Sequence, residues 1–109
     1  MKKLFAAVLF IPMLAQAEFR TGNQLFSEIQ STGVVEQMVS LGYIMGIADA
    51  LRGINHCPPA TVTAGQLRDM VKNYLDANPQ FRHYTADTIV MAVLKQAWPC
   101  ENKSKGTRL

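Results

Sequence analysis

The chain has 109 residues, of which 49% are hydrophobic and 17% are charged, and its formal net charge is +3. This length fits a single domain. Five of its basic residues lie near the two termini: Lys2, Lys3, Lys103, Lys105 and Arg108. Between residues 18 and 100 the charges nearly balance, which argues against a nucleic-acid-binding surface on the folded part.

The first 17 residues have the pattern of a secretory signal peptide. Two lysines precede an apolar run from Leu4 to Ala15, and Ala15-Gln16-Ala17 supplies the small residues of a cleavage site. The run is too short for a membrane-spanning helix, which needs about 20 apolar residues. We therefore expect export, cleavage after Ala17 and no membrane association of the mature chain. Residues 18–100 should form the folded domain, and residues 101–109 a flexible basic tail.

The two cysteines, Cys57 and Cys100, are expected to form one disulfide. Exported proteins meet an oxidising environment, and so small a mature chain buries too little surface to be very stable without a covalent link. In the chain-entropy model this link would contribute about 4 kcal/mol to the free energy of unfolding. A zinc site is less favoured, because structural zinc takes four ligands and only His56 lies beside either cysteine.

The spacing of apolar residues predicts four helices and no strand. A short first helix follows residues 21–23 and ends near residues 31–33, with one apolar stripe made by Leu25, Phe26 and Ile29. A second helix runs from Val34 to about Ile54. Apolar residues fall all round its helical wheel, so we expect it to lie buried in the centre.

Two more helices follow a break at residues 53–59. Thr63 and Gln66 form a capping box at the start of the third helix, which ends at Asn78-Pro79. Thr85 should cap a fourth helix over residues 86–97. Their expected buried residues are Leu67, Met70, Val71, Tyr74 and Leu75 in the third helix and Ile89, Val90, Val93, Leu94 and Ala97 in the fourth. The predicted fold is all-α, a small bundle of about four helices stapled by one disulfide.

Small residues recur every four positions on the second helix, at Gly42, Gly46 and Ala50. They favour close approach of another backbone over ligand binding, because no strand precedes them. The sequence leaves open whether this ridge packs within one chain or between two. Asp49 lies beside the ridge on a helix expected to be buried, so its carboxylate should have a partner, either Arg52 or a helix amino terminus.

No catalytic pattern is present in the sequence. It has no His-Glu-x-x-His, no phosphate-binding loop and no Gly-x-Ser-x-Gly, and both thiols are expected to be oxidised. We therefore expect no enzymatic activity, no cofactor and no metal. His56 could cap the carboxyl end of the second helix as a cation, but a solvated role is favoured for His56 and for His83 in its loop.

The strongest binding candidate is the segment Phe81-Arg82-His83-Tyr84. Aromatic and arginine side chains are the types that anchor protein interfaces. Equally, Phe81 and Tyr84 could fold back onto the core between the third and fourth helices, because aromatic residues are prominent in cores as well. The sequence favours neither interpretation.

A set of short motifs spans residues 22–100. They are Gly42 to Ala50 (GYIMGIADA), Cys57-Pro58-Pro59, Val62-Thr63, Gln66-Leu67, Tyr74-Leu75, Asn78-Pro79 and Trp98-Pro99-Cys100. Together they resemble the Tai-type immunity proteins, also called the resistance-associated Rap type. Proteins of this type are small and periplasmic, and they protect Gram-negative bacteria from peptidoglycan amidases delivered by type VI secretion systems.

The resemblance implies an all-helical periplasmic protein without enzymatic activity, often a homodimer, that lodges a loop or helix end in the active-site groove of an amidase. Exposure and residue type then suggest a set of partner-binding residues: Arg52, Asn55, His56, Phe81, Arg82, His83 and Tyr84. Four residues of the second helix, which we call the structural motif, are expected to have a structural role: Gly42, Tyr43, Gly46 and Asp49. Many members carry a second cysteine pair at positions matching Ile29 and Ser40, so the first helix should be held less firmly here.

Two other functions fit the same features. A periplasmic acid-stress chaperone of the small, single-disulfide helical type would expose apolar surface at low pH, and the methionine content would suit it. An envelope assembly factor with an unrelated partner is the other.

Overall fold

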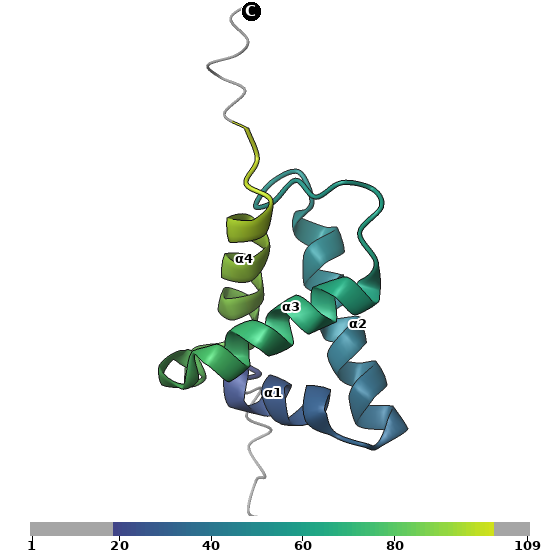
Figure 1. Cartoon of the computed structure of the whole chain (residues 1–109), viewed down its shortest axis with the longest axis vertical. Helices are drawn as coiled ribbons and strands as arrows, with labels where there is room; N and C mark the ends of the chain where they lie inside the picture. The colour runs from purple at the N-terminus through teal and green to yellow at the C-terminus, as the bar shows by residue number, and fades with distance from the viewer. Residues whose placement is uncertain (1–18, 102–109) are drawn as a thin grey trace, which may run out of the picture.

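The computed structural model of the protein describes residues 19–101, which form four α-helices and one short 3-10 turn (Figure 1). The helices are α1 (Gly22–Gln30), α2 (Val34–Leu51), α3 (Ala64–Ala77) and α4 (Ala86–Ala97), and the turn η1 (Pro79–Phe81) lies between α3 and α4. Within the described residues there is no strand, and Cys57 is bonded to Cys100. The all-α fold stapled by one disulfide is thus confirmed. The expected signal peptide, and all of the expected tail after Glu101, lie outside the described residues.

Capping boxes explain where two of the helices begin. Thr63 and Gln66 form the expected capping box. The backbone N–H of Gln66 donates to Thr63 Oγ1 at 3.2 Å, and the backbone N–H of Thr63 donates to Gln66 Oε1 at 2.7 Å. Thr21 and Gln24 form a second capping box at the start of α1. Thr85 precedes α4 as expected, although its hydroxyl pairs with that of Thr88 and not with a backbone amide.

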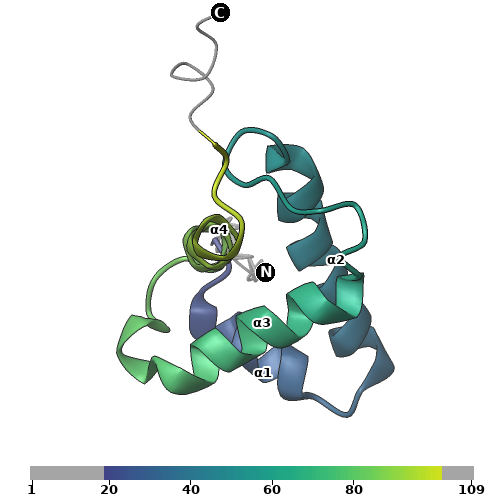
Figure 2. The same cartoon turned by 45° about the horizontal axis from the view of Figure 1, so that its top comes forward.

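The core is made by the inner faces of all four helices. Its buried residues are Leu25 and Ile29 of α1, Ile44 and Ala48 of α2, Leu67, Val71 and Leu75 of α3, and Ala86, Ile89, Val90, Val93 and Leu94 of α4. The predicted stripes of α1, α3 and α4 therefore face inward. The exceptions are half-buried Phe26, Met70 and Tyr74 and the exposed Ala97. Figure 2 shows α3 lying across the front of the bundle, with α2 passing behind it.

The prediction that α2 is buried all round was wrong. Only Ser40, Ile44 and Ala48 are buried on this helix, whereas Val35 is 71% exposed and Met38 is 68% exposed. The helix is long and apolar enough to cross a membrane by length and composition alone, with a mean hydropathy of 1.3. The exposed apolar residues of α2 lie on the side turned away from α1, α3 and α4.

The helix α2 also ends earlier than expected, at Leu51. Gly53 adopts a positive φ of +81°, a backbone conformation that glycine takes without strain, and the chain turns back at this point. The Gly53 amide donates to the His56 carbonyl at 2.8 Å, and the Cys57 amide donates to the Trp98 carbonyl at 2.8 Å. The loop after α2 is thus tied to the end of α4 by a hydrogen bond as well as by the disulfide.

A strap of backbone hydrogen bonds joins the start of the described chain to the start of α4. The Gly22 amide donates to the Tyr84 carbonyl at 2.8 Å, and the Ala86 amide donates to the Arg20 carbonyl at 2.7 Å. A Cβ at position 22 would lie 2.8 Å from the Arg82 carbonyl oxygen, which explains why glycine stands here. The first helix is therefore held by α4, although the chain has no cysteines at positions 29 and 40.

Candidate partner-binding surface

The turn between α3 and α4 is built around the side chain of Arg82. Its Nε donates to the Leu75 carbonyl at 2.7 Å, and Nη2 donates to the Asp76 carbonyl at 3.3 Å, so it caps the last turn of α3. The Arg82 guanidinium also lies 4.3 Å from the centre of the Phe26 ring, in cation–π geometry. These contacts give Arg82 a structural role in holding the turn.

The three aromatic residues around Arg82 gather on the surface, and we call Phe81, His83 and Tyr84 the aromatic cluster. The Phe81 and Tyr84 rings stack with their centres 5.8 Å apart, and the centres of the His83 and Tyr84 rings are 4.4 Å apart. Phe81 is half-buried, while 48% of Tyr84 is exposed. Both interpretations of the sequence therefore hold in part: the Phe81 ring packs against the bundle, and the Tyr84 ring is exposed to solvent.

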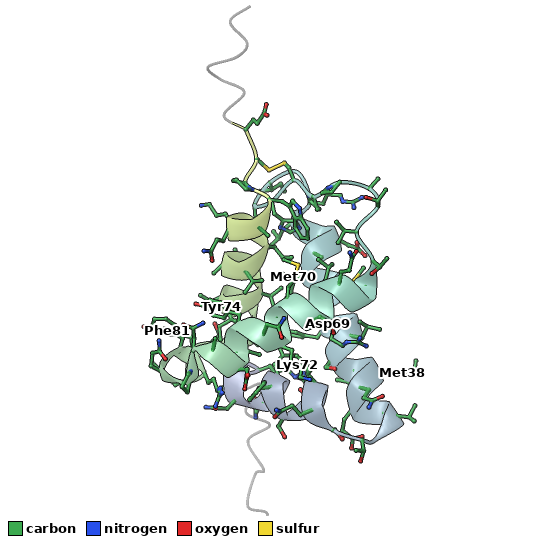
Figure 3. The ribbon with its side chains drawn as sticks, in the orientation of Figure 1. Met38, Asp69, Met70, Lys72, Tyr74 and Phe81 are labelled. Atoms are coloured by element: carbon green, nitrogen blue, oxygen red, sulfur yellow. A yellow bond between two sulfur atoms is a disulfide. The ribbon has the colours of Figure 1, made fainter. Side chains whose placement is uncertain are left out.

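A shallow hollow of about 180 Å³ adjoins the aromatic cluster. It is lined by Tyr74, Phe81, Tyr84, Thr88, Ile89 and Ala92. Figure 3 shows Tyr74 and Phe81 together at the α3 and η1 corner of the molecule, far from Met38 on α2. An apolar hollow beside exposed rings suits non-covalent contact with a protein partner.

The other group of expected binding residues lies in the loop after α2, at the opposite end of the bundle (Figure 1). Arg52 is exposed there, but the Asn55 side chain is occupied, donating to the Met91 carbonyl at 3.0 Å. His56 is 0% exposed, so the expectation that it is solvated was wrong. The structure therefore does not bring residues 52–56 and 81–84 into one surface.

His56 is buried because both of its ring nitrogens find partners. Nε2 lies 2.9 Å from the Ala48 carbonyl oxygen in the last turn of α2, and Nδ1 lies 3.2 Å from the Asn55 side-chain nitrogen. A carbonyl can only accept and an amide NH₂ can only donate, so Nε2 donates to Ala48 and Nδ1 accepts from Asn55. His56 does contact the carboxyl end of α2, but as a buried group.

The residues of the structural motif on α2 also differ from expectation. Gly42 and Gly46 are exposed, and a Cβ at either position would meet nothing within 4 Å, so the ridge packs against nothing within the described chain. Asp49 is exposed, and no ion pair joins it to another residue within 19–101. It needs no partner, because the helix is not buried on that side.

Tyr43 is the member of the motif that does pack within the chain. It is half-buried, and the Arg20 guanidinium lies 5.3 Å from its ring centre. Burial raises the pKa of the Tyr43 hydroxyl, and the charge of Asp87 raises it further, while Arg20 and a backbone hydrogen bond at Asp87 act in the opposite direction.

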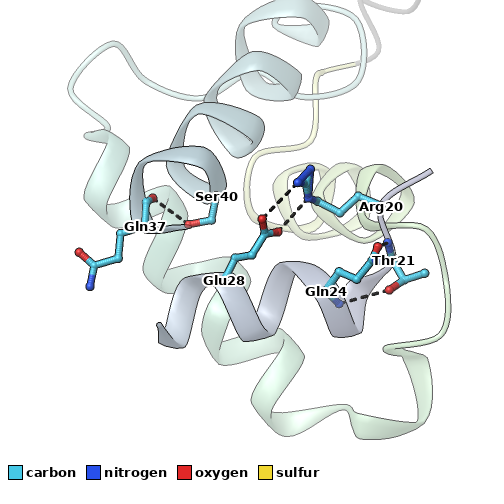
Figure 4. A network of polar contacts seen from close by, with 6 residues as sticks. All are labelled: Arg20, Thr21, Gln24, Glu28, Gln37 and Ser40. Carbon is cyan, nitrogen blue, oxygen red and sulfur yellow. Dashed lines mark hydrogen bonds and ion pairs between the residues drawn. The ribbon is translucent and has the colours of Figure 1, made fainter. Parts of the chain in front are cut away.

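A polar groove that the sequence did not indicate lies between Tyr43 and α1. Its volume is about 760 Å³, and it is lined by Phe19, Arg20, Asn23, Gln24, Ser27, Glu28 and Tyr43. Arg20 forms a two-point ion pair with Glu28, with Nε to Oε1 at 2.8 Å and Nη2 to Oε2 at 3.1 Å (Figure 4). Arg20 precedes the first helix, so no helical spacing rule could have linked it to Glu28.

The described residues offer several surfaces suited to binding a partner. No set of three His, Cys, Asp or Glu side chains within residues 19–101 is grouped so that it could hold a metal ion. The available surfaces are the aromatic cluster, the polar groove and the outer side of α2.

A family model of Rap1a immunity proteins matches residues 21–100, which include all four helices and both cysteines. The chain belongs to the Rap1a immunity protein family. No curated protein matches the chain. Membership confirms the resemblance at the level of an immunity-protein family, whose members are typically periplasmic, bind a partner effector and are not usually enzymes.

Proposed function

We propose that this Rap1a family protein is a periplasmic immunity protein that binds a type VI secretion peptidoglycan amidase and blocks its active site. The observation that carries the proposal is the family match over residues 21–100. The signal-peptide pattern of residues 1–17 and the single disulfide support action in the periplasm, where the substrate of such an amidase lies. The proposal includes the homodimer expected from the resemblance.

The aromatic cluster is the part of the surface that we assign to the amidase. A protein that only has to cover an active site needs a rigid surface with a few large anchors and no chemistry of its own. Arg82 supplies the rigidity, because its bonds to two carbonyls of α3 fix the backbone between Phe81 and His83. Tyr84 and Phe81 supply the anchors, beside an apolar hollow.

The test is a titration of peptidoglycan hydrolysis. The mature, oxidised protein is added to a type VI secretion amidase encoded next to its gene, and the released peptide or soluble glycan is measured. We expect hydrolysis to stop at about one equivalent of immunity protein. Loss of two interface anchors in Phe81→Ala with Tyr84→Ala should weaken inhibition by roughly a hundredfold or more.

The matched control is Phe19→Ala, which removes an aromatic ring that is 80% exposed but lies in the polar groove, outside the aromatic cluster. Inhibition should be unchanged. If Phe19→Ala abolishes inhibition and the double variant does not, the amidase binds the polar groove instead. If the protein neither binds nor inhibits the amidase but keeps acid-unfolded clients soluble, the chaperone interpretation replaces this proposal.

A further inference from the structure

The polar groove beside Tyr43 is a large cavity that the proposed amidase surface does not use. Its volume of about 760 Å³ lies in the range of sites that bind small molecules. None of its lining residues lines the hollow beside the aromatic cluster. The groove is therefore a separate candidate site, and the residues that line it indicate the chemistry of its ligand.

The charges in the polar groove are already paired with each other. The Arg20 guanidinium donates to both carboxylate oxygens of Glu28, and both side chains are partly buried (Figure 4). Among the described residues, no other charged side chain lines the groove. An anion would have to compete with Glu28 for Arg20, and a cation would have to compete with Arg20 for Glu28. The groove thus favours a ligand without net charge.

Uncharged polar groups of α1 line one wall of the groove. Asn23 and Ser27 lie about one helical turn apart, both are exposed, and neither side chain forms a hydrogen bond within residues 19–101. The side-chain oxygen of Gln24 accepts from the Thr21 backbone N–H, which leaves the NH₂ group of Gln24 available. Side-chain amides and hydroxyls supply donors and acceptors together. This wall therefore suits a ligand rich in hydroxyl and amide groups.

Two aromatic rings add apolar surface to the same groove. Phe19 is 80% exposed, and Tyr43 is half-buried with the Arg20 guanidinium 5.3 Å from its ring centre. Aromatic side chains present flat apolar faces to a ligand. A sugar ring matches a groove that has both kinds of surface, because its C–H groups form an apolar face and its hydroxyls lie around the edge. Paired charges, uncharged polar groups and an exposed ring thus together favour a sugar.

We infer that the polar groove binds a chain of neutral, N-acetylated sugars. Phe19 stacks on one sugar ring, while Asn23 and Ser27 form hydrogen bonds with acetamido and hydroxyl groups. An acetamido group suits this site, because its amide can pair with the Asn23 amide and its methyl group can contact an aromatic ring. The glycan strands of peptidoglycan have this chemistry. Choosing that source rests on the proposed periplasmic function, and it would hold the protein on the polymer that the amidase attacks.

The test titrates the mature, oxidised protein with chitotetraose, a chain of N-acetylglucosamine, and follows the backbone N–H signals by nuclear magnetic resonance. We expect saturable shifts at Asn23 and Ser27. Maltotetraose, which has no acetamido groups, should bind at least about tenfold more weakly. The dissociation constant for chitotetraose should change by less than about twofold between low salt and roughly 0.3 M salt, because an uncharged ligand is not screened.

Substitutions in the groove test which side chains bind the sugar. Phe19→Ala should raise the dissociation constant at least about tenfold, whereas Phe19→Trp, which keeps a ring, should stay within about threefold of wild type. Asn23→Ala with Ser27→Ala should also raise it at least about tenfold. All three side chains are exposed, so the thermal midpoint should change little. Tyr84→Ala, which removes an exposed ring of the aromatic cluster, is the matched control and should leave the constant unchanged.

Absence of saturable shifts with chitotetraose, or binding that Phe19→Ala leaves unchanged, would overturn the inference. Equal binding of maltotetraose would overturn the preference for N-acetylated sugars.

Co-sedimentation with purified peptidoglycan sacculi, displaced by chitotetraose, tests the source of the sugar. A protein that binds chitotetraose but not sacculi would overturn the assignment to peptidoglycan in favour of a soluble oligosaccharide. Amidase inhibition is measured separately. Phe19→Ala should lose sugar binding and keep inhibition, and Phe81→Ala with Tyr84→Ala should do the reverse, so failure of one proposal would not be mistaken for failure of the other.

Discussion

At the scale of single residues, two side chains hold the loops of the bundle by contacting backbone carbonyls. Arg82 caps α3 through the Leu75 and Asp76 carbonyls, and His56 binds the Ala48 carbonyl while its other nitrogen accepts from Asn55. In both cases the helix end would otherwise present acceptors without protein donors. Arg82 and His56 were expected from the sequence to bind a partner, but in the structure they stabilise the turns after α3 and α2.

Gly22 is a residue whose role can be tested directly. A Cβ there would lie 2.5 Å from Ile89 Cδ1 and 2.8 Å from the Arg82 carbonyl oxygen, so the strap between α1 and α4 must shift to admit it. We expect Gly22→Ala to lower the free energy of unfolding by about 1–3 kcal/mol. Urea unfolding followed by circular dichroism measures this.

The control for that substitution is Gly65→Ala in the first turn of α3. A Cβ at position 65 would have its nearest neighbour at 3.6 Å, an ordinary contact, so alanine should be neutral or stabilising by up to about 1 kcal/mol. Equal destabilisation by both variants would show that the close approach at Gly22 is not the cause.

Tyr43 predicts how stability changes in alkali. Its pKa is raised by burial above the usual value of about 10, so the unfolded chain releases this proton at lower pH than the folded chain does. The resulting stability is present in full below about pH 10 and is lost as the pH rises through the folded-state pKa.

Tyr43→Phe should therefore make the free energy of unfolding fall less steeply above about pH 10 than it does in wild type. A series of urea unfolding curves across this range provides the measurement. Tyr84→Phe, which removes a hydroxyl from the surface, is the control variant. An unchanged slope in Tyr43→Phe would contradict the prediction.

The sequence could not predict the roles of these residues, for a physical reason. Arg82 binds carbonyls six and seven residues away, and His56 binds one eight residues away, around turns whose shape depends on packing. Capping boxes, by contrast, involve side chains three residues apart. Thr63 and Gln66 could therefore be predicted from spacing alone.

At the scale of helices, periodicity succeeded where a helix has one apolar side. Of the thirteen residues predicted to be buried on α1, α3 and α4, nine are buried, because alternation with polar residues gives each of these helices one apolar side. On α2 the spacing of apolar residues does not show which side of the helix faces the core. A helix that is apolar all round can be covered by its own chain alone or by its own chain and a partner, and composition does not distinguish these cases.

The contact between α1 and α2 predicts a site for a second disulfide. Ile29 and Ser40, at the positions where related proteins are expected to carry cysteines, are both buried and line one cavity of about 220 Å³. Ile29→Cys with Ser40→Cys should form this bond under oxidising conditions and raise the free energy of unfolding by about 3 kcal/mol.

Thiol counting and urea unfolding, with and without reductant, check this prediction. The variant should have no free thiols when oxidised, and its added stability should disappear when only the new bond is reduced. The two single variants control for the loss of each native side chain. Two persistent free thiols in the double variant would contradict the expected geometry.

At the scale of the whole molecule, the disulfide closes a long loop covalently. Cys57 and Cys100 are 43 residues apart, and the loop between them includes α3 and α4. Cys57→Ala with Cys100→Ala should lower the free energy of unfolding by about 4 kcal/mol, a large part of the total for a small domain. Reduced wild type should match the variant, and a reductant should have no effect on the variant itself.

The candidate binding surfaces were less predictable than the fold, because exposure is a property of the whole molecule. Phe81, His83 and Tyr84 do gather on the surface, and their closeness in sequence was enough to suggest it. The polar groove at Arg20 forms only where α1 and α2 meet, and the exposed apolar residues of α2 are those that the other helices leave uncovered. Neither the groove nor the uncovered side of α2 can be predicted from local sequence patterns.

The strap and the disulfide have a consequence for the order of events in the cell. Residues 20–23 form backbone hydrogen bonds with residues 82–86, and Cys57 forms its disulfide with Cys100. The first part of the domain therefore depends on the last part for its contacts. A nascent chain cannot finish this structure until nearly all of it has been synthesised. For the periplasmic location proposed above, such delayed completion would leave the polypeptide unfolded during export, and folding would be completed after translocation.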